Sequence, residues 1–387
     1  MTTRRRFLAG AGGTAAISGL GGCLGFLDAN GGEGTDPLPE EGEKTDDELL
    51  TAMADPSSQV PPLFFSGYRY RIDEFGENLD PTETVPRAGG AVARFFAEQL
   101  DGPGIDDLRH ITGSIYNSTA SSGSLEFQPL PSGQAVHAVG EFDADPLVEV
   151  VENSEAHVSL EESDGYERYF AEIQGGDGIE AWGIDDGRLV VVNRTDVTSR
   201  NSDYDNHEET ASDALTIEFD QVNREDAPIV NAAPAFAETV RQLDSGTIRA
   251  GTGYALVPEG SDTGTAAFDD AISGVVGAGI SATVEEEPHL QRAVSYLESG
   301  RASEERVRGA YEASETDNVP LDAWEFTTAG TTVNARASLT EQPTPEMLRT
   351  GLPVPGYGSL FTRVYPNELS REPTPRVFFQ PTVNDGT

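Results

Sequence analysis

The sequence predicts an α+β fold made of two modules, each a mostly antiparallel sheet with helices packed on one face, after a disordered N-terminal tether. Three observations support this class. Segments in which apolar and polar residues alternate, typical of half-buried strands, recur through the chain. Segments with the apolar spacing of amphipathic helices lie between them. Two pairs of strand segments are separated by tight, Gly-containing turns, which indicate antiparallel hairpins.

The first module begins near residue 63 with a strand in which Tyr68, Tyr70 and Ile72 share one face. The helix that follows has four apolar residues at the spacing i, i+3, i+4 and i+8, namely Val92, Phe95, Phe96 and Leu100. Further strands are predicted at residues 108–116, 124–128 and 134–142. A helix then starts at Asp145 and Pro146 and is followed by a strand at 166–173 and a hairpin at 179–193.

A helix around residues 214–222 ends the first module. The second module repeats part of the first module's order, and its first helix starts near Pro234, with Phe236, Val240 and Leu243 on one face. A strand ends near residue 257. A strand at 290–298, a helix at 303–314 and a hairpin at 321–339 follow. The order strand, helix, strand, strand occurs in both halves, so we predict an internal repeat.

Composition divides the chain into five segments. Residues 1–22 form an export signal, and residues 23–60 form a lipidated cysteine with an acidic tether, since low hydrophobicity and high charge favour disorder. The two α+β modules occupy residues 61–228 and 229–342. Residues 343–387 are rich in proline and are expected to form an extended C-terminal segment, within which residues 376–380 are able to add an edge strand.

Charge restricts the possible partners. The chain has 67 acidic and 25 basic residues, a net charge of −42, and 24 of the basic residues are arginine. This excess of acid excludes electrostatic binding to nucleic acid or to anionic lipid headgroups, which both require a basic surface. It is typical of a halophilic protein, because molar salt shortens the Debye length to about 3 Å and weakens repulsion between carboxylates.

The N-terminus carries an export motif. Residues 3–8 read Thr-Arg-Arg-Arg-Phe-Leu and resemble the twin-arginine signal, with Arg4, Arg5, Phe7 and Leu8 at its specified positions. The resemblance implies that the twin-arginine translocase exports the folded chain. The Gly- and Ala-rich run that follows is about 15 residues long, which is too short and too weakly apolar for a transmembrane helix.

The single cysteine follows this run. Residues 20–23 read Leu-Gly-Gly-Cys and resemble a lipobox, in which Cys23 is lipidated and becomes the first mature residue. The resemblance implies anchoring to the outer face of the cytoplasmic membrane, with the lipid as the only membrane contact. A lone cysteine also excludes a disulfide framework and a cysteine zinc site.

Metal and cofactor motifs are not found in the sequence. No two of the five histidines are three or four residues apart, and there is neither a nucleophile elbow nor a P-loop, so we predict no cofactor, no metal and no catalytic residues. Close pairs of carboxylates have little diagnostic value among 67 acids. The densest oxygen cluster contains Asp203, Asp205 and Glu208, and we interpret it as a solvated acidic loop, with a hard-cation site as the weaker alternative. His137 is expected to be a buried or cross-strand residue.

Two glycosylation sequons occur in the chain. Asn117 and Asn193 each begin an Asn-x-Ser/Thr triplet, and each lies near the end of a predicted strand. Export makes N-glycosylation at both positions a hypothesis.

Residues 60–340 resemble a group of haloarchaeal twin-arginine-exported lipoproteins of uncharacterised function. The resemblance rests on Phe142-Asp143 at the end of a strand, Gly165-Tyr166 at the start of the next, and the apolar run at residues 189–192. It brings no catalytic residues with it. The missing catalytic motifs favour a non-catalytic binding or interaction module on the cell surface, with other envelope proteins as potential partners.

Two alternatives remain open from the sequence. An extracellular hydrolase built on carboxylates or on an isolated serine is one, because single residues can meet in the fold. A solute-binding protein is the other, although the paired parallel-sheet domains usual for that class do not match the predicted order of elements.

Overall fold

The computed structural model describes residues 47–55, 64–76, 79–85, 87–100, 102–117, 131–154, 157–160, 165–172, 178–196, 207–222, 227–254, 270–271, 273–284, 287–312, 319–344 and 347–348. The predicted export signal, the predicted lipobox, the strand predicted at 124–128 and the segment 349–387 lie outside these residues.

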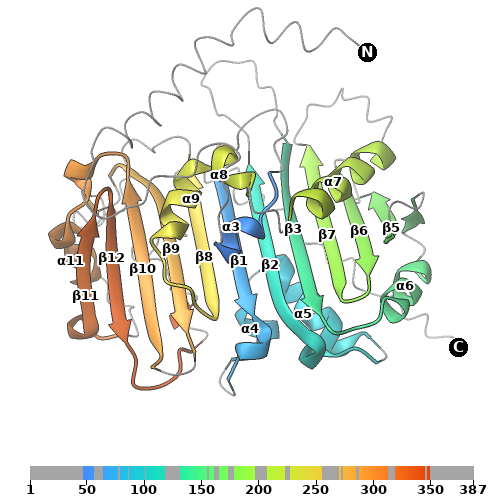
Figure 1. Ribbon diagram of the computed structural model, residues 1–387, viewed down its shortest axis with the longest axis horizontal. Coiled ribbons are helices and arrows are strands. Elements are labelled where there is room, and N and C mark those ends of the chain that lie inside the picture. The colour runs from blue at the N-terminus through green and yellow to red at the C-terminus, as the bar shows by residue number, and fades with distance from the viewer. Residues whose placement is uncertain are drawn as a thin grey trace, which may run out of the picture.

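The described strands form one continuous antiparallel sheet (Figure 1). Its spatial order is β11-β12-β10-β9-β8-β1-β2-β3-β7-β6-β5-β4. The strands are β1 (Phe64–Arg71), β2 (Leu108–Asn117), β3 (Pro131–Gly140), β4 (Val158–Ser159), β5 (Glu167–Glu172), β6 (Gly178–Asp185), β7 (Arg188–Asp196), β8 (Ile248–Tyr254), β9 (Val275–Thr283), β10 (His289–Tyr296), β11 (Trp324–Ala329) and β12 (Thr332–Ser338). The predicted α+β class with antiparallel strands is confirmed.

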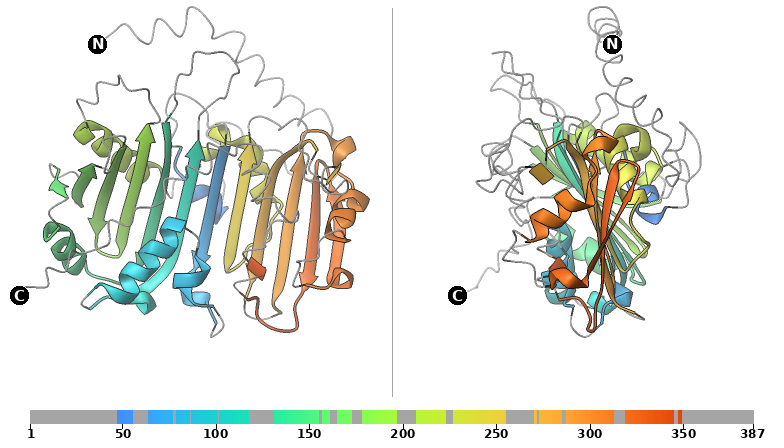
Figure 2. Two further views of the ribbon diagram at one scale, coloured as in Figure 1. Left: turned by 180° about the vertical axis from the view of Figure 1, so that it is seen from behind. Right: turned by 90° about the vertical axis from the view of Figure 1, so that its left-hand side faces the viewer.

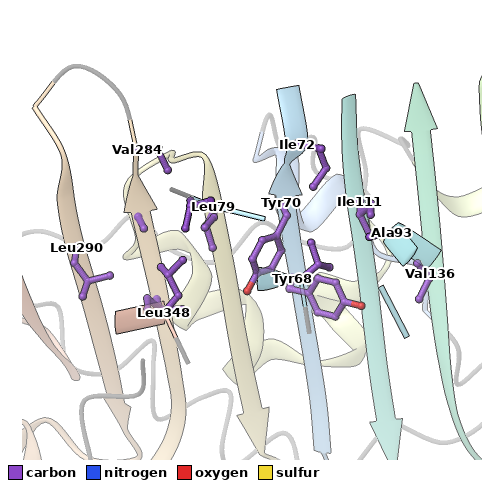
Figure 3. Close-up of a cluster of buried hydrophobic side chains, with 14 of the residues drawn as sticks. Tyr68, Tyr70, Ile72, Leu79, Ala93, Ile111, Val136, Val284, Leu290 and Leu348 are labelled. Atoms are coloured by element: carbon purple, nitrogen blue, oxygen red, sulfur yellow. The ribbon is translucent and has the colours of Figure 1, made fainter. Parts of the chain in front are cut away.

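Helices cover both faces of this sheet, whereas the sequence predicted one face (Figures 1 and 2). One face carries α3 (Glu48–Thr51), α7 (His207–Gln221), α8 (Ile229–Ala232) and α9 (Pro234–Arg241), and the other carries α4 (Pro81–Thr84), α5 (Arg87–Glu98), α6 (Asp145–Glu152) and α11 (Glu304–Glu312). The central strands are apolar on both sides, so both sides must be covered. On β1, Phe65 packs edge-on against Phe236 of α9 at 4.8 Å, while Tyr68 and Tyr70 point to the opposite face, beside Ile111 (Figure 3).

The two halves of the sheet share part of their topology, and the internal repeat stays a prediction. The sequence order β3, α6, β4, β5, β6, β7 gives the spatial order β3-β7-β6-β5-β4, and the sequence order β10, α11, β11, β12 gives β10-β12-β11. Both hairpins turn where expected, with glycines in the left-handed region at Gly187 and Gly330. The sheet runs without interruption between the two halves, because residues 64–70 of β1 pair with β8.

Part of the predicted tether is folded. Asp47 caps α3, and Leu49, Leu50 and Met53 are at most 1 % exposed within a core cluster that includes Phe236. The disorder prediction is therefore wrong for residues 47–55. The prediction relied on the mean composition of a long acidic segment. The three apolar side chains are too few to change that mean, but they are enough to complete a core cluster.

Candidate functional site

A cleft of about 480 Å³ lies where α3 and the C-terminal end of α9 meet β1 and β8. We call it the arginine cleft, after four cationic residues that line it together with two acidic ones: Arg69, Arg71, Arg241, Arg249, Asp47 and Glu48. Leu49, Leu243, Ser245 and Gly246 complete the lining. The elements that carry its lining residues, α3, α9, β1 and β8, meet where the two halves of the sheet join (Figure 1).

Strand geometry brings the arginines together. Arg69 and Arg71 are two residues apart on β1 and therefore point to the same face. Arg249 of β8 stands directly opposite Arg69 in the ladder, and Arg241 is the last residue of α9. Like charges directly opposite each other destabilise a sheet, so this arrangement requires carboxylates close by.

Asp47 and Arg249 form the most buried ion pair of the cleft. Arg249 Nη1 donates to Asp47 Oδ1 at 2.9 Å and Nη2 donates to Oδ2 at 2.8 Å, with side-chain exposures of 10 % and 13 %. Arg249 Nη2 also donates to the carbonyls of Val240 and Leu243 at 2.6 and 3.0 Å. Because Asp47 Oδ1 accepts the first amides of α3 as well, this pair connects the start of α3 to the end of α9.

Glu48 is held differently. Its Oε2 lies 2.5 Å from Arg71 Nη2 and 3.3 Å from Arg69 Nη1, and its side chain is 52 % exposed. The hydrogen bond from Arg71 lowers the pKa of Glu48, which keeps this carboxylate ionised. Arg71 Nη1 also donates to Glu74 at 2.8 Å. Four arginines therefore gather in one cleft with Asp47 and Glu48, in a chain whose total charge is −42.

His110 lies at the edge of the cleft, opposite Arg71 in the pairing of β1 with β2. Burial, followed by the charge of Arg69, lowers the pKa of His110 to about 4. The imidazole is therefore neutral in the folded chain at pH 5–7.

This shift predicts an acid-dependent loss of stability. The unfolded chain protonates His110 near pH 6.5, whereas the folded chain resists protonation until about pH 4. Above pH 6.5 the ring is neutral in both states, so the shift does not affect stability. As the pH falls from 6.5 towards 4, only the unfolded chain binds the proton, and the free energy of unfolding decreases by about 2–3 kcal/mol. We expect His110→Gln to lose that much less stability than the wild type between pH 7 and pH 4.5 in urea unfolding at molar NaCl. Equal losses in the two proteins would contradict the prediction.

A second polar cluster fixes α7 on the same face. His137 Nε2 and Glu218 Oε2 are 2.7 Å apart, and both side chains are buried, which confirms the position predicted for His137. Arg188 donates to the Glu218 carbonyl at 3.2 Å and lies 4.1 Å from the ring centroid of Phe219. The polar groups of this cluster form hydrogen bonds with one another. They therefore stabilise the packing of α7 on the sheet, and the cluster offers no polar group to a ligand.

Ser154, His157 and Glu180 lie close together near the C-terminal end of α6. Ser154 Oγ lies 3.0 Å from His157 Nδ1, but His157 Nε2 lies 3.5 Å from Glu180 Oε1, and Trp182 Nε1 donates to that oxygen at 2.7 Å. The Ser154 amide donates to the Val151 carbonyl, and the C-terminal end of a helix disfavours a developing negative charge. This cluster does not have the geometry of a hydrolase triad.

The structure describes few of the predicted site residues. Arg4, Arg5, Phe7, Leu8, Cys23, Asp203 and Asp205 lie outside the described residues. Glu208 was predicted in a loop but is exposed in the first turn of α7, where its negative charge interacts favourably with the helix dipole. Within the described ranges no group of three metal-ligating side chains is found.

The two sequons differ in their structural setting. Asn117 ends β2, where it pairs with Ser132, and its glycosylation stays a prediction. Asn193 lies within β7, between Gln134 of β3 and Glu180 of β6, and is 9 % exposed. The sequence predicted Asn193 near the end of a strand, whereas it lies within β7, an interior strand covered on both faces, where a glycan does not fit.

Sequence reasoning missed the arginine cleft. One local signal was present, because Arg69 and Arg71 alternate on a predicted strand in a chain that is poor in basic residues. Arg241, Arg249 and Asp47 join them only through tertiary packing.

Comparisons with known proteins add little. No protein-family model matches the chain, and no curated protein matches it. Two solved structures of TP0453 are similar in part. Crystal form IV has a TM-score of 0.37 and 9 % identity over 75 % of this chain and 95 % of its own, and crystal form I has a TM-score of 0.39 and 10 % identity over 84 % and 99 %. Likenesses this weak carry no argument about fold or function.

Proposed function

We propose that the chain is a surface-anchored extracellular lipoprotein of a halophile that binds a small anion in the arginine cleft without catalysing a reaction. The observation that carries the proposal is the convergence of four arginines on one cleft in a chain of charge −42. The ligand would carry carboxylate or phosphate groups, which the guanidinium fork binds with charge-assisted hydrogen bonds.

The size of the cleft and the salt expected around the protein both support small-anion binding. A volume of about 480 Å³ falls in the range of small-molecule sites, about 300–1,000 Å³. In molar salt the Debye length is about 3 Å, so the acidic surface does not repel an approaching anion over a long distance. Contacts at hydrogen-bonding distance then decide affinity, and these are the contacts that the arginines offer.

Anchoring rests on the motif of Arg4, Arg5, Phe7 and Leu8 and on the lone Cys23. No helix in the described part of the chain is long and apolar enough to cross a membrane. On this proposal the partners are the twin-arginine translocase during export, the membrane through the lipid, and other envelope proteins.

Replacing Cys23 tests the anchor. We expect Cys23→Ser to move the protein from the membrane fraction to the medium, because the thiol is the only group that a lipobox lipidates. Fractionation of intact cells, with immunodetection in each fraction, measures the change. Retention of the variant in the membrane fraction would contradict lipid anchoring.

Calorimetric titration tests the cleft. We expect citrate or inorganic phosphate to bind the purified soluble chain in molar NaCl, and the double variant Arg69→Gln/Arg71→Gln to lose about tenfold or more in affinity. Arg109→Gln is the matched control, since Arg109 is 58 % exposed and pairs only with Glu141 among the described residues. Absence of heat with both probes, or equal affinities in all three proteins, would overturn the proposed function.

A further inference from the structure

We propose that the Glu48 carboxylate occupies the position of a ligand carboxylate in the arginine cleft and swings out when a small polycarboxylate binds. This inference rests on the proposed function, and it adds the ligand class and a built-in competitor. It starts from two neighbouring acids, Asp47 and Glu48, which line the same cleft but are held in different ways.

Asp47 is the fixed member of the pair. It accepts both terminal nitrogens of Arg249 and the amides of Leu49 and Leu50, and its side chain is 13 % exposed. Removing it from this position would leave a buried guanidinium and the first turn of α3 without their acceptor. Asp47 therefore holds α3 in place whether or not a ligand is bound.

Glu48 is the displaceable member. Its side chain is 52 % exposed, and its contacts are ion pairs with Arg69 and Arg71 at the surface of the cleft. Exposed ion pairs are worth about 0–1 kcal/mol, so a ligand that replaces Glu48 loses little. The backbone of α3 does not have to move, because the residues that follow, Leu49 and Leu50, remain buried in the core.

The position of Glu48 also indicates the ligand class. One of its oxygens lies between two guanidinium groups, so these arginines are already arranged around a carboxylate. Arg241 and Ser245 line the rest of the cleft and offer polar contacts to a second acidic group. A small molecule with two or three carboxylates fits both parts, and inorganic phosphate fits only the first.

The experiment compares Glu48→Gln with a matched control. Glu98→Gln removes the same charge from an exposed position on α5, on the opposite face of the sheet. In calorimetric titration we expect Glu48→Gln to bind citrate up to about fivefold more tightly than the wild type, the factor that corresponds to one exposed ion pair. Glu98→Gln should bind citrate as the wild type does, and phosphate should bind more weakly than citrate to every protein. Hydrogen exchange at the Leu49 and Leu50 amides should not change on citrate binding.

The outcomes separate this inference from the proposed function. If citrate binds the wild type and Glu48→Gln equally, the role of Glu48 is wrong and the binding function stands. If neither citrate nor phosphate binds either protein, both proposals fail. If Glu48→Gln binds citrate and the wild type does not, the ligand does not displace Glu48 and the inference is overturned. Tighter binding of phosphate than of citrate, or faster exchange at Leu49 and Leu50 with citrate, would overturn it.

Discussion

Replacing Arg249 with alanine should lower the free energy of unfolding by about 3–5 kcal/mol, the range observed when one partner of a buried ion pair is removed. The guanidinium of Arg249 is 10 % exposed and forms four hydrogen bonds, two with Asp47 and two with carbonyls at the end of α9. The variant leaves the Asp47 carboxylate partly buried without its cation. Urea unfolding at molar NaCl measures the change.

The control and the mutant cycle make this result specific. Arg109→Ala removes an exposed arginine and should change stability by less than about 1 kcal/mol. The double variant Asp47→Ala/Arg249→Ala should lose less stability than the sum of the two single losses, because each single variant leaves a partly buried charge without its partner and the double variant leaves none. A loss below about 1 kcal/mol for Arg249→Ala, or strictly additive losses, would show that the pair does not hold α3 to α9.

Replacing Gly253 with alanine should destabilise the chain by about 3 kcal/mol, at the upper end of the cost of overpacking a core. A Cβ atom at this position on β8 would lie 2.7 Å from the Cα of Phe236 and closer still to its amide nitrogen. These are backbone atoms in the first turn of α9, which a change of rotamer cannot move aside. The same turn carries the Phe236 ring, which is fully buried and packs on Phe65. Thermal and urea unfolding both report the effect.

The same change in open space provides the control. Gly309 lies in α11, and among the described residues no atom beyond its chain neighbours and its own helix backbone is within 4 Å of its Cβ position. Gly309→Ala should therefore stabilise the chain by about 0.5–1 kcal/mol, because alanine is the better helix former. If Gly253→Ala were as well tolerated as Gly309→Ala, the close approach of α9 to β8 would be wrong.

Much of the fold could be predicted from local patterns. The hairpins that turn at Gly187 and Gly330, the α6 helix and the buried face of α9 with Phe236 all follow from periodicity and turn chemistry within a few residues. Helices on both faces could not be predicted in this way. The strand β1 alternates Phe65 with Tyr68 and Tyr70 on opposite sides, and only the positions of α5 and α9 show that both sides are covered.

The folded end of the tether and the arginine cleft were missed for one physical reason. Each is formed by residues whose partners are distant in sequence, such as Asp47 and Arg249, which are 202 positions apart. No local pattern reports a contact of that kind. Glu48 and Asp47 are both acids in an acidic segment, and only their burial and partners distinguish a structural cap from a displaceable carboxylate.

By itself, the sequence determined the α+β class and most of the longer helices and hairpins, because their secondary structure follows from spacing along the chain. It predicted neither α3 nor β9. It also determined the acidic balance, because charge is a sum over residues. The tertiary structure decided where the few cations gather. The antiparallel register of β1 with β8 places Arg69 opposite Arg249, and the burial of Leu49 and Leu50 brings Asp47 and Glu48 over them. Electrostatic interaction depends on distance in space, and the fold alone sets that distance.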